Sequence, residues 1–241
     1  MFYRVFFLFP FLLTAFSACV STDTVKSSKV DFDTINAKYT LFQTQDTGRE
    51  VTVKLEFRVG GTTGTTVEFD EGEKFLVNGE TIPFYLGGTS AINTEGSYYQ
   101  RVIELDDATE TLDITFMDKQ AVEHKEVVSR ARPVAFTSVS DGDAIDITKP
   151  LQITFAPAIE ASGELDWRDT VDNKGNYQDH ISTDTGSGTF DFSAQNITGK
   201  NVIAVFLKAR VSKTSSVPPE GFVQGSVSSG YETKTLTLHL P

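Results

Sequence analysis

The stretch EVTVKLEFRV, residues 50–59, alternates apolar and polar side chains without interruption. Because successive side chains of a β-strand point to opposite faces, this period of two predicts a strand with one buried face. Between two later runs, Asn78-Gly79 favours a two-residue hairpin turn, since both positions of that turn require positive φ. No ten-residue segment after residue 18 shows a helical period, so the sequence predicts an all-β fold. Further strand-like runs lie at residues 66–69, 81–86, 98–105 and 111–117.

A second series of strand-like segments follows a break at SRARPV, residues 129–134. Pro133 lacks a backbone N–H and biases the residue before it toward an extended conformation, so we expect the chain to leave its sheet there. We therefore predict two modules, at residues 32–132 and 133–241, each with the density of strands and turns that is typical of a β-sandwich. In architecture they resemble the tandem immunoglobulin-like or fibronectin-like β-sandwiches of bacterial envelope proteins. One larger β-sandwich is the alternative.

The chain has one cysteine, Cys19, which stands where an apolar segment ends and a polar one begins. The apolar run from Val5 to Phe16 follows Arg4, and it is too short to span a membrane as a helix. A charged start, an apolar centre and small residues before a cut are typical of a secretory signal. The order Phe16, Ser17, Ala18, Cys19 is similar to the lipobox of bacterial lipoproteins, although Leu is commonest where Phe16 stands.

The lipobox resemblance implies cleavage between Ala18 and Cys19, with lipid attached to the cysteine. Residues 1–18 are then the signal peptide, and residues 19–31 are predicted to be the lipidated cysteine and a flexible tether, because VSTDTVKSSKVD has no apolar period. Val20 in place of Asp resembles the outer-membrane sorting pattern. We therefore expect a bacterial cell-envelope protein, anchored to the outer membrane by its lipid.

The charge of the chain bears on its partners. Its formal net charge is −12, and loss of Arg4 with the signal would make it −13. Nucleic acid is an unexpected partner, because phosphate binding requires clustered Lys and Arg. With one cysteine, no disulfide can form within the chain, so burial of apolar side chains must hold it together. The expected partners are the membrane, through the lipid, and an envelope protein or glycan.

The sequence shows no motif for a catalytic or metal site. His124, His180 and His239 have no zinc-ligand spacing, and no nucleophile elbow or phosphate-binding loop is present. We predict a non-catalytic binding or scaffolding protein without a cofactor; an envelope hydrolase with a site assembled from loops is the alternative. Three acids resemble the calcium-binding linkers of some tandem β-domains, but a plain Asp-Gly turn also explains them: Asp141, Asp143 and Asp146.

One long segment without periodicity, residues 168–189, follows the strand that ends at Trp167. Loops of this length inside compact domains are generally functional or disordered. Aromatic side chains beside amides and carboxylates would suit a glycan or peptide, whereas a mobile acidic loop without a ligand is the simpler interpretation. The candidate ligand residues are Trp167, Asp172, Asn176, Tyr177, Asp179 and His180.

Overall fold

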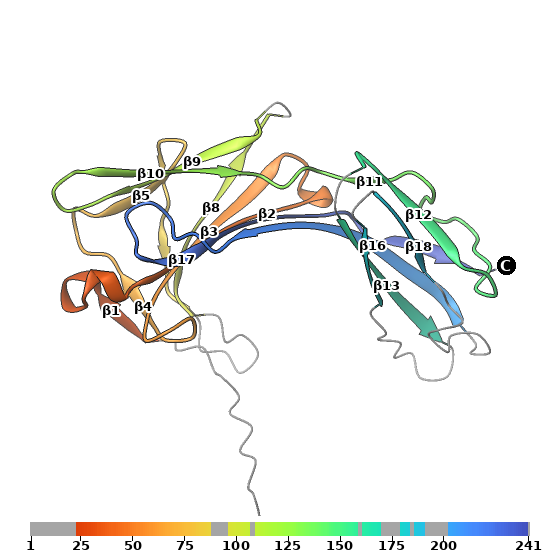
Figure 1. The fold of residues 1–241 in the computed structure, drawn as a ribbon, viewed down its shortest axis with the longest axis horizontal. Coiled ribbons are helices and arrows are strands. Elements are labelled where there is room, and N and C mark those ends of the chain that lie inside the picture. Colours follow the sequence, from red (N-terminus) through yellow and green to blue (C-terminus); the bar gives the residue numbers. More distant parts are fainter. Residues whose placement is uncertain are drawn as a thin grey trace, which may run out of the picture.

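The computed structural model describes residues 23–87, 96–106, 109–158, 161–169, 179–183, 186–190 and 202–240. Figure 1 shows strands gathered in two lobes, joined by long strands that run from one lobe to the other. The helices of the described residues are single 3₁₀ turns, η1 (Ser27–Lys29), η2 (Phe32–Thr34) and η3 (Gln45–Thr47). None of the helical segments in this part of the chain is long and apolar enough to span a bilayer. The prediction of an all-β fold built of packed sheets is confirmed.

The first lobe is a sandwich of two sheets. The predicted strand at residues 50–59 is β3 (Glu50–Val59), and its apolar face is buried as expected. One layer contains, besides β3, the strands β1 (Thr24–Lys26), β4 (Thr65–Glu68), β2 (Asn36–Thr44), β8 (Tyr98–Glu104) and β7 (Phe84–Tyr85). The other layer has the order β10 (Glu123–Ser129), β9 (Thr111–Met117), β5 (Lys74–Val77) and β6 (Glu80–Thr81).

Aromatic side chains fill the space between these two layers. Phe57 stacks on Phe75 with ring centroids 4.5 Å apart, and Phe75 in turn stacks on Phe116 at 4.9 Å. The three rings come from β3, β5 and β9, so this cluster joins both sheets. The predicted hairpin also forms, with φ of 48° at Asn78 and 85° at Gly79.

The second lobe packs a small sheet against the other end of the large one. Its small sheet has the order β11 (Ala135–Phe136), β12 (Leu151–Ala156) and β15 (Ser187–Phe190). The facing strands are β16 (Val202–Ser215), β13 (Ala161–Asp169), β14 (Asp179–Thr183) and β18 (Leu236–His239). Ile153 and Phe155 from the small sheet share a core with Val205 and Leu207 from β16.

The molecule has two apolar cores. Along the chain, the first core takes the buried residues up to Val128, and the second takes most of those from Ala131 onward. Strand pairing nevertheless connects the two lobes. Strand β17 (Gln224–Glu232) pairs with β16 on one side and, along its whole length, in parallel with β2 on the other. Phe222, just before β17, is buried in the first core, where its ring lies 5.1 Å from that of Phe32. The segments proposed as two modules therefore share one sheet.

The N-terminal segment departs from the prediction. Within the proposed flexible tether, β1 pairs in parallel with β4, from Thr24 opposite Thr66 to Lys26 opposite Glu68. The tether prediction is wrong for these residues, because a strand at the edge of a sheet needs no apolar alternation. Its partner lies about forty residues further along the chain, so no local pattern reveals the pairing.

Candidate functional site

The predicted lipid site lies just before the described part of the chain. Ala18 and Cys19 lie outside the described residues, which begin at Asp23. Strand β1 begins at Thr24, so only the four residues VSTD separate the cysteine from the fold. A fully extended chain spans about 3.3–3.6 Å per residue, and these five steps therefore reach at most about 18 Å.

The predicted ligand loop is shorter than the sequence indicates. Trp167 belongs to β13, where its backbone lies opposite Val205, while Asp179 and His180 begin β14. The expectation of an irregular segment is thus wrong for 168–169, 179–183 and 187–189, which belong to strands. DHIST and SGTF lack the apolar alternation that marks a half-buried strand. The remaining candidates lie outside the described residues: Asp172, Asn176 and Tyr177.

The three acids near the start of the second lobe stabilise turns. Asp141 accepts a hydrogen bond from the Thr237 N–H (2.7 Å), and Asp143 accepts one from the N–H three residues before it (2.7 Å). Asp146 accepts from the Thr148 N–H at 2.9 Å, and hydrogen bonds from Thr148 and then Lys149 lower its pKa to about 2. Among the residues that the structure describes, no three His, Cys, Asp or Glu side chains are placed to hold a metal ion.

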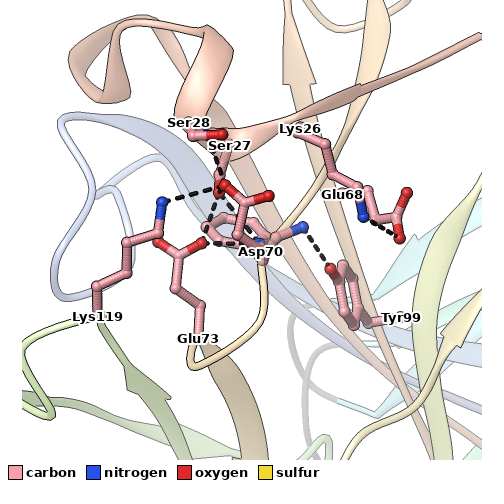
Figure 2. A network of polar contacts seen from close by, with 9 residues as sticks. Lys26, Ser27, Ser28, Glu68, Asp70, Glu73, Tyr99 and Lys119 are labelled. Atoms are coloured by element: carbon pink, nitrogen blue, oxygen red, sulfur yellow. Dashed lines mark hydrogen bonds and ion pairs between the residues drawn. The ribbon is translucent and has the colours of Figure 1, made fainter.

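A polar network fixes the N-terminal segment to the first lobe, and we call it the N-terminal latch: Ser27, Ser28, Asp70, Glu73 and Lys119 (Figure 2). The Asp70 carboxylate accepts hydrogen bonds from the Ser28 N–H and from the Lys119 ammonium, both at 3.0 Å. These contacts, with Ser28 the larger cause, hold the pKa of Asp70 well below its usual range. The Ser27 hydroxyl donates to Glu73 at 2.5 Å and accepts from the Asp70 N–H at 3.2 Å.

Two further contacts extend the latch along β4. Lys26 forms an ion pair with Glu68 at 2.6 Å, which joins the side chains of β1 and β4 (Figure 2). The buried Tyr99 hydroxyl accepts a hydrogen bond from the Phe69 N–H at 2.8 Å, and burial raises its pKa to about 12. These contacts therefore fix the N-terminal segment in place against the first lobe.

A groove lies between the two lobes, and we call it the inter-lobe groove. Its main cavity has a volume of about 750 Å³ and is lined mainly by the start of β9, the end of β10 with the segment after it, and the last part of β16. A smaller hollow of about 250 Å³ shares Ser129 and Lys213 with it and continues along β10 toward β17. A cavity of this size at a domain boundary is a common place for a ligand.

The charges of this groove differ from those of the whole chain. Its main cavity is lined by three cations, Arg130, Arg132 and Lys213, against one carboxylate, Glu110. Arg132 and Glu110 lie 3.4 Å apart, and both side chains are largely exposed. From the sequence alone, the SRAR stretch predicted only a module boundary. Two arginines beside a strand break in an acidic chain are the signal that could have pointed to this groove.

Comparisons with known proteins give no family. No protein-family model and no curated protein matches the chain. Matched solved structures include a chain from the crystal structure of DIP-gamma IG1+IG2, with 11% identity, a TM-score of 0.21 and coverage of 85% of this chain and 98% of that one. Another comes from the crystal structure of Dpr11 IG1 bound to DIP-gamma IG+IG2, with 11% identity, a TM-score of 0.20 and coverage of 85% and 96%.

Proposed function

We propose that this chain is a lipid-anchored protein of the bacterial cell envelope that binds or scaffolds a protein partner without catalysing a reaction. The observation that carries the proposal is the position of its single cysteine. Cys19 directly follows an apolar run and two small residues, and the fold begins five residues later at Thr24. Lipid on Cys19 would hold the first lobe beside the bilayer, because the intervening chain is short.

The physical chemistry of lipid anchoring supports this arrangement. One acyl chain gives only marginal, reversible membrane binding, whereas each further buried CH₂ adds about 0.8 kcal/mol, so two or three chains hold a protein firmly. The N-terminal latch and β1 would then attach the first lobe firmly to the lipidated segment, since Lys26 and Ser27 bond to side chains of that lobe.

The binding part of the proposal is supported by the inter-lobe groove. Its lining combines cations with polar hydroxyls and an adjacent exposed valine, Val127, whose side chain is 56% exposed. A cavity with a few charged groups at the meeting of two lobes suits recognition of another molecule. Outer-membrane placement is proposed on Val20 alone.

The test of anchoring compares the wild type with Cys19→Ser in the native host grown with labelled palmitate. We expect label in the wild type and none in the variant, with the wild type in the outer-membrane fraction of a density gradient. A wild type without lipid in the soluble periplasm would contradict the anchor.

Hydrolase profiling of the purified protein tests the proposal that the protein is not an enzyme. Turnover that is lost on replacing His124 would contradict a non-catalytic role.

A further inference from the structure

Strand β10 forms one edge of its sheet, because the described residues pair it with β9 alone. The Arg130 N–H donates to the Glu110 carbonyl at 2.9 Å, which fixes the direction of the backbone groups along the strand. In an antiparallel pair these groups alternate between the partner and the opposite side. Even-numbered residues of β10 therefore bond to β9, whereas Lys125, Val127 and Ser129 direct their N–H and C=O groups outward.

The first half of this edge is covered by the chain itself. The Glu220 N–H donates to the Glu126 carboxylate at 3.1 Å, and Gly221 lies so close to the His124 ring that an added Cβ would meet it at 2.8 Å. The second half, at Val127 and Ser129, borders the smaller hollow and then the main cavity of the inter-lobe groove.

In the first lobe, the sheet that faces the β10 layer continues past the edge formed by β10, from β2 through β17 to β16. The hollow beside Val127–Ser129 is lined from that layer by Val227–Ser229 of β17 and by Lys213–Ser215 of β16. One more strand beside β10 would therefore lie over β17 and the end of β16. Such a strand would extend the layer of the sandwich that contains β10.

The side chains around this position describe the segment that would fit. Val127 and Val217 line the hollow with exposed side chains, 56% and 68% exposed, so apolar residues suit that end. Arg130, Arg132 and Lys213 line the main cavity at the other end. An incoming segment with apolar residues followed by Asp or Glu would match both parts.

We propose that the inter-lobe groove binds an extended, acidic segment of a partner protein, which pairs with the outward backbone groups of Val127 and Ser129 and sets its carboxylates against Arg132 and Lys213. This deepens the proposed binding function and rests on it. Strand addition of this kind takes affinity from backbone hydrogen bonds and specificity from side-chain contacts.

The experiment uses the full mature chain in detergent and a library of random peptides displayed on phage. Peptides selected on the wild type are then tested for binding to the double variant Arg132→Glu/Lys213→Glu. We expect the recovered peptides to be enriched in Asp and Glu. A synthetic copy of one should bind the double variant about tenfold or more weakly than the wild type. Lys149→Glu/Lys234→Glu, which reverses two exposed charges outside the groove, is the matched control and should leave binding unchanged.

Two further readouts separate strand pairing from simple charge attraction. In the complex, the Val127 and Ser129 amides should gain protection from hydrogen exchange, while the Val128 amide, already bonded to β9, should change little. Val127→Pro removes an outward N–H without removing a bond to β9 and should abolish binding. Lys125→Pro makes the same change in the covered half and should retain it.

Several outcomes would overturn the proposal: recovery of no peptide, peptides that bind Val127→Pro or the charge-reversed variant as tightly as the wild type, or exchange protection confined to another surface. None of these results depends on Cys19. Failure here is therefore distinguishable from failure of the anchoring proposal, which the palmitate experiment tests alone.

Discussion

Asp70 is the residue on which the N-terminal latch depends. Its carboxylate receives the Ser28 N–H and the Lys119 ammonium, and its own N–H donates to Ser27 and to Glu73 (2.9 Å). The hydrogen bond from Ser28 and then the bond from Lys119 lower the pKa of Asp70, because both favour the charged carboxylate. The folded state therefore binds a proton at Asp70 less readily than the unfolded chain does.

This difference in proton affinity gives a pH-dependent prediction for Asp70→Asn. Because the pKa of Asp70 is lower in the folded state, its charged carboxylate stabilises the fold above the unfolded pKa of about 3.9. This stabilisation is lost as the pH falls through the folded pKa of Asp70. The wild type should therefore melt at a higher temperature than the variant above about pH 5, and the difference should shrink on further acidification. Thermal unfolding followed by circular dichroism at several pH values measures this.

Glu71→Gln is the control for that experiment, because Glu71 is an exposed neighbour of Asp70 outside the latch. It should leave the melting temperature nearly unchanged across the pH range. An Asp70→Asn difference that stays constant, or grows, toward low pH would contradict the role assigned to the latch.

At the scale of elements, β17 is the strand that joins the lobes. It pairs with β16 and β2, and Phe222 before it lies against rings of the first core that include those of Phe32, Phe57 and Phe116. A segment near the C-terminus thus completes the core formed by residues near the N-terminus. The two lobes should therefore unfold together.

Phe222→Ala tests this coupling. Removing a buried phenylalanine costs about 3 kcal/mol or more, and the exposed Val223→Ala should cost less than about 0.5 kcal/mol. Trp167 is the chain's only tryptophan and belongs to β13 in the second lobe. We expect its fluorescence and the far-UV circular dichroism to shift together in urea. A Trp167 transition that stays in place while the dichroism splits into two steps would show independent lobes.

Some elements could be predicted from the sequence and others could not, for physical reasons. β3 was predictable because its burial follows from its own alternation. Arg58, on the polar face of β3, is nevertheless only 4% exposed, because its guanidinium donates to the Gly64 carbonyl and to Thr66 after the chain turns back (3.1 Å each). β1 depends on a distant parallel partner, β4, and could not be found by local pattern.

The candidate site was still less visible in the sequence. The inter-lobe groove brings together the end of β10 and the end of β16, about eighty residues apart in the chain. Neither segment carries a binding motif, and the groove exists only because β16 continues past its pairing with β13 at Arg210. The loop that the sequence favoured contains strand β14, so backbone pairing accounts for part of its length.

For the whole molecule, the short chain between Cys19 and β1 predicts an orientation. With lipid on Cys19, the first lobe should stay within about 18 Å of the bilayer at Thr24, since extended chain limits the reach. Figure 1 places β1 in one lobe and β12 in the other. The face around β1 should therefore lie nearer to the membrane than the second lobe.

Fluorescent labels can report this orientation in vesicles that contain brominated lipids. Lys29→Cys labels the segment beside the latch and Lys149→Cys labels the second lobe just before β12, while a lipidated Cys19 has no free thiol to react. We expect stronger quenching at position 29 than at 149. Equal quenching at both positions would contradict the orientation.

Lipid on Cys19 underlies both the proposed anchoring and the predicted orientation, and mass spectrometry of the N-terminal peptide from the native membrane measures it. We expect a mature chain that begins at Cys19 and has the added mass of a diacylglyceryl group on its sulfur, with or without a further acyl chain on its amino group. A chain that begins at any other residue, or a Cys19 with a free thiol, would contradict it.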